Sequence, residues 1–229
     1  MTTTNLHPIK VYGGSIGPNP LKISIILEEL NLPITNELIP FAELKKPSYE
    51  AINPNGRLPA IHDPNTGLTL WESGAIIEYI VETYDKEHKL RFPAGSAEDY
   101  HARQWLYFQA TGQGPYFGQA VWFKRYHSER LQSAIERYIG EIKRVCGVLE
   151  NWLKEREWLV GEKMSYADLA FVSWHNAALG ILGEEGLSYD EYPKMKRWLE
   201  RMNERPVVKR LVEVQRVFFE KVAAGEIQK

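Results

Sequence analysis

Apolar and polar residues alternate with two different periods along the first third of the chain. Short apolar runs bounded by turn residues predict strands, and apolar residues at i, i+3, i+4 and i+7 predict helices. Ile23, Ile26, Leu27 and Leu30 mark one such helical stripe. The predicted order is strand, helix, strand, helical turn, a two-stranded hairpin and a helix: 9–12, 20–30, 34–41, 47–52, 58–63, 68–71 and 73–84.

From residue 98 on, the pattern is helical only, after a charged stretch with Pro93 and Gly95 that is typical of a linker. The motif Ser165-Tyr166-Ala167-Asp168 predicts a capping box before a buried central helix over 169–182. Residues 112–115, Gly-Gln-Gly-Pro, predict a break between two helices. The other predicted helices are 100–111, 116–126, 131–153 and two that begin at Pro193 and Pro206. We therefore expect an α/β domain over 1–87, a linker over 88–97 and an all-α helical domain over 98–229.

Charge and cysteine content exclude several classes of protein. The 229-residue chain has a formal net charge of −2, which gives no basic face for nucleic acid. Its one cysteine, Cys146, cannot form an intrachain disulfide, and no histidine spacing is typical of a metal site. No apolar run approaches the roughly 18 residues of a membrane span, and residues 1–8 lack a signal core. We expect a cytoplasmic protein with no metal, no membrane contact and no nucleic-acid partner.

The segment from Asn53 to Ile61 is the first candidate site. Asn53-Pro54-Asn55-Gly56 is a run of turn formers, and Pro59 then stands near the start of a strand. Because proline cannot donate to a strand ladder, the backbone before it is left to pair with something outside the sheet. A cis Leu58–Pro59 bond would hold the Leu58 amide and carbonyl outward.

Glu72 and Ser73 form the second candidate site, since they stand where a helix is predicted to begin. A helix N-terminus has unpaired amides that suit a carboxylate, and the Glu72 carboxylate beside it suits an ammonium. Together they fit the backbone end of an amino acid. The alternative is an ordinary serine N-cap without a ligand.

Along essentially its whole length the sequence resembles the soluble glutathione transferases. The similarity is carried by Pro18-Asn19, by Asn53-Pro54-Asn55-Gly56-Arg57-Leu58-Pro59 and by Trp71-Glu72-Ser73-Gly74-Ala75-Ile76. The later segments 104–109, 134–138 and 158–163, with Ala167-Asp168, are similar to the fungal nitrogen-regulator-like branch of that family and to its bacterial disulfide-reducing branch.

The resemblance implies a thioredoxin-like N-terminal domain, a homodimer, and glutathione as co-substrate. It implies that Leu58 pairs its backbone with the cysteinyl unit, that Pro59 is cis, and that Glu72 and Ser73 hold the γ-glutamyl end. Arg57 or Lys45 would face the glycyl carboxylate. Arg137 would reach the glutathione of a partner subunit, or else form a surface ion pair with Glu141 four residues on.

Thiol activation is the chemical step that such a site has to provide, because a free thiol with a pKa near 8.5 is only a few per cent ionised at pH 7. Asn19, just before the first helix, is the leading donor, with helix capping as its alternative role. Ser15 is the nearest hydroxyl, and Gly17 stands where the bacterial relatives carry threonine. This loop has no cysteine, which excludes a mechanism based on a protein thiolate there.

Two functions remain open from the sequence. The first is a transferase that directs glutathione at electrophiles, hydroperoxides or disulfides, with an electrophile pocket lined by Tyr116, Trp122, Phe123 and Trp174. Helical aromatic residues of this kind also serve as core packing. The second is a non-catalytic regulatory or assembly protein that has the same fold and binds glutathione.

Overall fold

The computed structural model describes residues 6–14 and 16–224. Their packing divides them into two compact units, with the boundary between Lys89 and Leu90. The described residues from Glu204 onward pack with the first unit. The sequence had assigned that last segment to the helical domain, so the packing unit and the sequence domain differ there.

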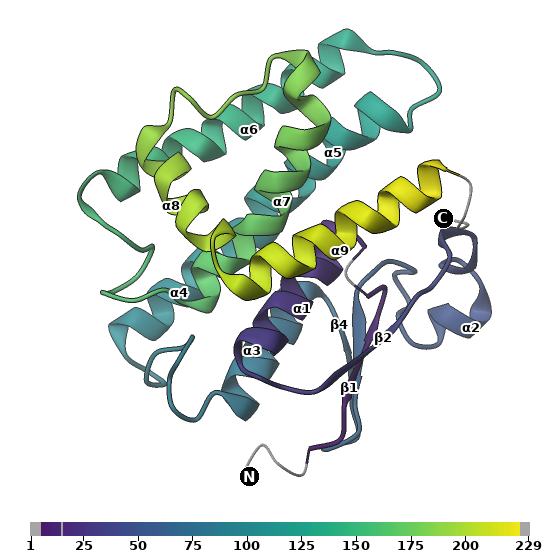
Figure 1. Ribbon diagram of the computed structural model, residues 1–229, viewed down its shortest axis with the longest axis vertical. Coiled ribbons are helices and arrows are strands. Elements are labelled where there is room, and N and C mark those ends of the chain that lie inside the picture. Colours follow the sequence, from purple (N-terminus) through teal and green to yellow (C-terminus); the bar gives the residue numbers. More distant parts are fainter. Residues whose placement is uncertain (1–5, 15, 225–229) are drawn as a thin grey trace. The chain divides into compact units, whose positions relative to one another are not determined.

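The first unit is built on a four-stranded mixed sheet with the strand order β2-β1-β3-β4 (Figure 1). β1 (Ile9–Tyr12) runs parallel to β2 (Ile34–Glu37) and antiparallel to β3 (Ala60–Asp63), which pairs with β4 (Leu68–Trp71). The expected strands are present, although the second one ends at Glu37 and the third begins at Ala60, both shorter than predicted.

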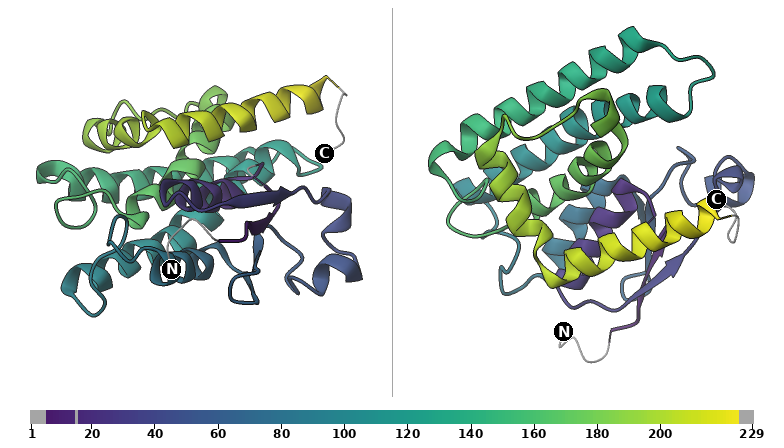
Figure 2. Two further views of the ribbon diagram at one scale, coloured as in Figure 1. Left: turned by 60° about the horizontal axis from the view of Figure 1, so that its bottom comes forward. Right: turned by 45° about the horizontal axis from the view of Figure 1, so that its top comes forward.

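Helices cover this sheet. α1 (Pro18–Glu29) packs on α3 (Ser73–Tyr84) and on β1, and α9 (Pro206–Ala223) lies along α1. Figure 2 shows α9 beside α1 from two further directions. Two short helical segments, η2 (Phe41–Glu43) and α2 (Pro47–Glu50), connect β2 to the turn before β3. The strand–helix–strand and hairpin–helix order predicted from the sequence is confirmed.

A small apolar cluster lies under the turn that precedes β3. Tyr12 and Ala60 face each other across β1 and β3, and both pack against Tyr49 of α2. The Tyr12 and Tyr49 rings meet edge to face with centroids 6.3 Å apart. Leu58 packs against this cluster from its rim, so the candidate turn rests on a rigid base.

The regular elements of the second unit, residues 90–203, are all helices. Its elements are α4 (Ala97–Phe108), a π-helical turn η3 (Gln109–Gln113), α5 (Gly114–Arg125), α6 (Gln132–Trp152), η4 (Leu153–Glu155), α7 (Tyr166–Leu182), η5 (Gly183–Glu185) and α8 (Pro193–Asn203). α7 contacts α4, α5 and α8, and its first half is buried, which confirms the predicted central helix. The capping box of Ser165 and Asp168 is also confirmed.

The expected break at residues 112–115 is wrong. The chain passes from α4 into α5 through one wide turn, so the helical path continues. Within that turn the buried Gln109 side chain donates to Gln113 at 2.9 Å, and Gln113 donates to the Phe171 carbonyl of α7 at 3.0 Å. These bonds satisfy polar groups that would otherwise be buried without partners.

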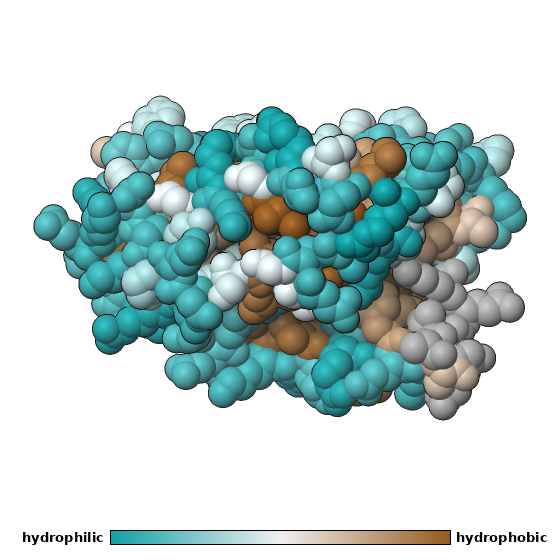
Figure 3. Space-filling view, turned by 90° about the horizontal axis from the view of Figure 1, so that it is seen from above, coloured by the Kyte–Doolittle hydropathy of each residue, from teal (hydrophilic) through white to brown (hydrophobic). Residues whose placement is uncertain are grey.

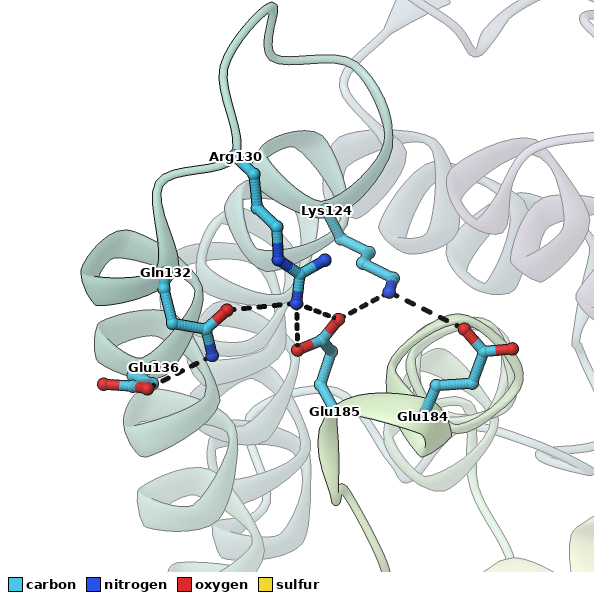
Figure 4. Close-up of polar contacts among 6 residues, drawn as sticks. All are labelled: Lys124, Arg130, Gln132, Glu136, Glu184 and Glu185. Carbon is cyan, nitrogen blue, oxygen red and sulfur yellow. Dashed lines mark hydrogen bonds and ion pairs between the residues drawn. The ribbon is translucent and has the colours of Figure 1, made fainter.

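Ion pairs connect the end of α5 and the loop after it to η5 (Figure 4). They are formed by Lys124, Arg130, Glu184 and Glu185. Glu185 accepts from Lys124 at 2.5 Å and from Arg130 at 2.8 Å, and it is the least exposed member, at 7% of its side chain. The hydrogen bonds from Lys124 and Arg130 lower the pKa of Glu185 to about 2. The carboxylate is therefore ionised whenever the protein is folded near neutral pH.

Hydrophobic residues are mostly enclosed within the two units, and on the face in Figure 3 hydrophilic residues dominate, with hydrophobic ones showing in small groups. None of the described helices combines the length and the apolar character needed to cross a lipid bilayer.

Candidate functional site

Two loops of the first unit touch each other at Gly13 and Leu58. Gly13 has φ +100°, and a Cβ added to it would lie 2.9 Å from Leu58 Cδ1. Only glycine fits both the backbone conformation and the contact. The loop that leads into α1 is therefore held directly against the turn that leads into β3.

The turn from Asn53 to Leu58 is held by two buried side chains. The Arg57 carbonyl accepts from the Tyr49 hydroxyl at 2.9 Å and from Asn53 Nδ2 at 2.6 Å. The Asn53 Oδ1 atom accepts from the Asn55 amide at 2.9 Å. Burial raises the pKa of Tyr49 to about 12, so the hydroxyl stays a donor at neutral pH. Sequence reasoning gave Tyr49 no role, because nothing in its local pattern marks it as a partner of the turn.

The Leu58–Pro59 peptide bond is cis, which confirms the expectation. The Leu58 main-chain amide and carbonyl make no hydrogen bond to another described residue. Leu58 itself is half-buried, while Pro59 and Ala60 are buried. An extended peptide laid along the turn could therefore pair with Leu58 as with a strand edge.

The start of α3 is the next part of the site. Ser73 is the first helical residue and is 8% exposed. Glu72 precedes it with φ +69°, and neither residue caps the helix through its side chain. Ser73 is therefore not the N-cap of α3, and the alternative of an ordinary serine N-cap is wrong. The first amides of α3 and the Ser73 hydroxyl lie where a carboxylate would be stabilised.

Lys22 of α1 adds a buried cation that sequence reasoning missed. Its side chain is 1% exposed, and burial lowers the pKa of its ammonium to about 7, an effect that the Glu72 charge opposes. Glu72 is itself exposed. The Glu72 charge therefore acts on the Lys22 amine, and the exposed carboxylate is accessible to a ligand ammonium. The signal in the sequence was a lysine within an apolar helical segment.

Asn19 lies inside the first turn of α1 rather than before the helix, because α1 begins at Pro18, two residues earlier than expected. Gly17 is the N-cap, so the capping alternative for Asn19 is not seen. Pro18 and Pro20 have no N–H, so Asn19 supplies the only main-chain N–H of residues 18–20, together with its side-chain amide. Ser15, the other candidate donor, lies outside the described residues.

Lys45 and Arg57 lie at the outer side of the turn. Lys45 Nζ donates to the Asn55 carbonyl at 2.7 Å, and it passes within 2.9 Å of where a Cβ of Gly56 would stand. Arg57 is exposed. Both cations are thus close to the turn, with the Lys45 ammonium bound to it.

In the second unit, Arg137 forms an ion pair within its own helix. Its Nη1 lies 2.5 Å from Glu141 Oε1, and Arg144 holds the other oxygen of Glu141 at 2.7 Å. The alternative of a surface ion pair is therefore realised in the single chain.

Of the four aromatic residues expected to line an electrophile pocket, Trp122 and Phe123 contact each other edge to face, with ring centroids 5.0 Å apart. Tyr116 and Phe123 lie beside Tyr138 of α6, with ring centroids 6.4 and 5.7 Å away. Trp174 of α7 reaches the opposite face of α5, where its ring would be 3.3 Å from a Cβ on Gly118. Trp122 is 42% exposed.

No group of three or more His, Cys, Asp or Glu side chains among the residues that the structure covers is arranged to hold a metal ion.

Comparison with known proteins gives matches over nearly the whole chain. Residues 16–83 match the model of the glutathione S-transferase N-terminal domain, and residues 84–206 match that of the C-terminal domain. The glutathione S-transferase-like protein gedE of Aspergillus terreus is 53% identical over 91% of this chain and 96% of its own. Glutathione S-transferase 1 of Schizosaccharomyces pombe is 43% identical over 84% of this chain and 90% of its own.

A solved structure shows the same likeness. The glutathione transferase URE2P8 of Phanerochaete chrysosporium, crystallised with oxidized glutathione, superposes with a TM-score of 0.88 at 38% identity, covering 95% of this chain and 99% of that one.

Proposed function

The chain belongs to the glutathione S-transferase family and is a glutathione transferase, and on that premise we propose that it holds glutathione at the first loop, the Asn53–Pro59 turn and the start of α3. The observation that carries this proposal is the main chain of Leu58, which makes no hydrogen bond to another described residue and lies beside buried Pro59. Relatives crystallised with glutathione or its conjugates support the choice of ligand.

The roles follow from the charge of each part of the tripeptide. Leu58 pairs through its amide and carbonyl with the cysteinyl unit. Ser73 and the first amides of α3 take the γ-glutamyl carboxylate, and Glu72 takes the γ-glutamyl ammonium. The exposed cations Lys45 and Arg57 face the glycyl carboxylate.

Asn19 stabilises the glutathione thiolate in this proposal. One pKa unit of lowering needs about 1.4 kcal/mol of preferential interaction with the anion. One or two hydrogen bonds at a helix N-terminus, with the favourable helix dipole, are of that size. The thiolate then attacks an electrophilic carbon and displaces its leaving group. A hydroperoxide or a disulfide needs the same activated thiolate, so peroxidase and disulfide-reductase activity belong to the same proposal.

The test separates binding from thiol activation. Asn19→Ala should lower kcat for a chloronitrobenzene about tenfold or more, while the affinity for glutathione changes less than about twofold. Glu72→Gln is the matched comparison, because it removes the acceptor for the ligand ammonium and should weaken glutathione binding about tenfold or more. Equal losses of binding and turnover in Asn19→Ala would show that Asn19 is structural.

The comparisons favour catalysis over the regulatory alternative, because relatives between 41% and 53% identical are named as glutathione S-transferases or as glutathione S-transferase-like proteins. Passing the protein over immobilised glutathione and then assaying a chloronitrobenzene, cumene hydroperoxide and a mixed disulfide tests this directly. Retention on the column without turnover of any of the three would reverse the conclusion.

The proposal also includes a homodimer, a role for Arg137 at the partner's glutathione and a cytoplasmic location. Family membership supports a homodimer in which Arg137 of one subunit approaches the glutathione of the other. Light scattering after size-exclusion chromatography should give twice the chain mass of 26.5 kDa. Arg137→Ala should then weaken glutathione binding, whereas Arg144→Ala, which removes the other cation on Glu141, should not.

Tyr116, Trp122, Phe123 and Trp174 are retained as candidate contacts for the electrophile. Tyr116 projects from α5 towards Tyr138, whereas Trp174 of α7 lies against Gly118 of α5. Single substitutions should therefore show which of the two contacts the electrophile. A residue that contacts the electrophile raises the KM for the electrophile when replaced by alanine and leaves the KM for glutathione unchanged.

A further inference from the structure

The last helix of the chain contacts the loop that carries the proposed thiol donor. On α9 the residues that face the first unit form an apolar stripe, with Val208 and Leu211 buried and Phe218 half-buried. Gln215 stands in the middle of this stripe, at a position where helical spacing calls for an apolar side chain. A half-buried amide at such a position needs a hydrogen-bonding partner.

That partner is the main chain of the first loop. Gln215 Nε2 donates to the Ile16 carbonyl at 2.7 Å across 199 positions of sequence. Ile16 directly precedes Gly17, the N-cap of α1, whose carbonyl accepts from the Leu21 amide at 2.9 Å. The bond therefore fixes the loop three residues before Asn19, at the point where the helix begins.

α9 is itself anchored independently of this bond. Arg205, next to the first residue of α9, makes two hydrogen bonds to the buried Glu29 carboxylate at the end of α1, at 2.7 and 2.6 Å. Arg210 pairs with Glu28 one turn further on. Because the helix is fixed at its start, the Gln215 amide reaches the loop from a rigid support, and the loop can be displaced without undocking α9.

We propose that Gln215 is a positioning residue for thiol activation, which fixes the loop so that Asn19 points its donors at the glutathione sulfur. This inference rests on the proposed role of Asn19. Hydrogen bonds weaken steeply with distance and angle. A donor that is oriented before the thiolate forms stabilises it without a reorganisation cost. Loss of the Gln215 bond would leave Asn19 present but less well aimed.

The main test is Gln215→Leu, which removes the donor while keeping a side chain that fits the apolar stripe. The pKa of bound glutathione is followed by the ultraviolet absorption of its thiolate, and kcat/KM is followed against pH. We expect the thiol pKa to rise by about half to one unit, and turnover at pH 6.5 to fall about three- to tenfold. Glutathione affinity should change less than about twofold, because Leu58, Glu72 and Ser73 are untouched.

Val212→Ala is the matched control, because Val212 is half-buried on the same helix, one turn before Gln215. It loosens the packing of α9 without touching the Ile16 carbonyl, so it should lower the melting temperature and leave the thiol pKa unchanged. If Val212→Ala shifts the thiol pKa as much as Gln215→Leu does, the effect belongs to general packing and the inference is overturned.

A double-mutant cycle with Asn19→Ala separates this inference from the proposed function. Positioning through Asn19 requires that Gln215→Leu has no further effect on the thiol pKa once Asn19 is alanine. A shift with Asn19→Ala but none with Gln215→Leu overturns the inference and leaves the proposed site standing. Additive shifts overturn the coupling, and no shift in Asn19→Ala overturns the role of Asn19 and the inference with it.

Discussion

His175 is a histidine enclosed by aromatic rings in the middle of α7. The rings of Phe117 and Tyr189 have centroids 5.3 Å from its own, and Nδ1 lies 3.2 Å from the Tyr189 hydroxyl. Burial lowers the pKa of His175 to about 3. The imidazole is therefore neutral at every pH at which a glutathione transferase works, and it acts as a polar core residue.

This burial predicts a loss of stability in mild acid. The unfolded chain protonates His175 below a pKa of about 6.5, whereas the folded chain does so only near 3, so the unfolded state binds more protons between these values. The free energy of unfolding should fall by about 2 kcal/mol from this group between pH 7.5 and pH 5. Urea titrations of the parent protein and of His175→Leu at several pH values measure the contribution of His175 to the free energy of unfolding.

The exposed His101 provides the control, since His101→Gln should leave the pH dependence as it is. If His175→Leu and the parent protein lose the same free energy between pH 7.5 and pH 5, the imidazole is not a neutral core group.

Single residues were predictable where a local motif fixes them. The Ser165 and Asp168 box is set by neighbours in sequence, and the cis Leu58–Pro59 bond was expected from the family resemblance. The burial of Lys22 and the enclosure of His175 depend on segments far away in the chain, whereas the Tyr49 hydroxyl bonds a carbonyl only 8 residues further on. A residue type and its near neighbours carry no signal of that.

At the level of elements, the attachment of α9 to α1 depends on one buried carboxylate, that of Glu29. Glu29 is 3% exposed and accepts two hydrogen bonds from Arg205, which is itself about one-third exposed. Removing the guanidinium leaves a buried charge with Lys89 as its remaining cation at 3.9 Å. Because breaking a fully buried pair costs 3–5 kcal/mol and solvent screens this one in part, Arg205→Ala should destabilise the protein by about 2 kcal/mol.

Arg210→Ala is the control on the same helix. Its partner Glu28 is more exposed than Glu29, and Arg210 is 57% exposed, so the loss should stay below about 1 kcal/mol. Chemical denaturation of both variants gives the comparison. Equal effects would show that burial of Glu29 is not what anchors α9.

The charged cluster in Figure 4 predicts a similar contrast between two adjacent residues. Glu185 is held by Lys124 and Arg130, whereas Glu184 is 88% exposed and lies 3.6 Å from Lys124. Glu185→Gln should lower the melting temperature clearly more than Glu184→Gln. Because the pKa of Glu185 is lowered to about 2, its stabilising effect is present above about pH 4.5 and is lost as the pH falls towards 2. Equal melting temperatures at pH 7 would contradict this.

Most elements were predictable from periodicity, and the exceptions have a physical cause. Pro115 and two glycines predicted a break, because proline removes a hydrogen bond and clashes with the preceding turn. The π-helical turn over 109–113 widens the path, and buried glutamines bridge it to α7. Such tertiary compensation is not visible in a local pattern.

At the level of the whole molecule, sequence order and packing give different divisions of the chain. The N-terminal α/β fold and the helical character of the rest were predictable because both are written in local periodicity. The grouping of α9 with the first unit was not, since an amphipathic stripe shows that a helix packs without showing against what. The packing of α9 on the first unit matters for the proposed chemistry through Gln215, which bonds the Ile16 carbonyl of the first loop.

The whole chain contains one thiol, which gives a prediction for the source of the reactive sulfur. Cys146 lies buried in α6, and burial raises the pKa of its thiol to about 12. A neutral, enclosed thiol does not react with alkylating agents, because the thiolate is the nucleophile. N-ethylmaleimide applied to the native protein, and removed by desalting before glutathione is added, should therefore leave transferase activity unchanged.

The same treatment in denaturant should add one adduct per chain by mass spectrometry, and Cys146→Ala should keep the parent activity. Activity that falls in step with labelling of Cys146 in the native protein would mean that the helical unit opens during turnover or that its thiol takes part in catalysis. Unchanged activity with an unlabelled Cys146 leaves glutathione as the only thiol available for the reaction. The sulfur of the reaction is then that of glutathione, as the proposed site at the first loop, the turn at Pro59 and the start of α3 requires.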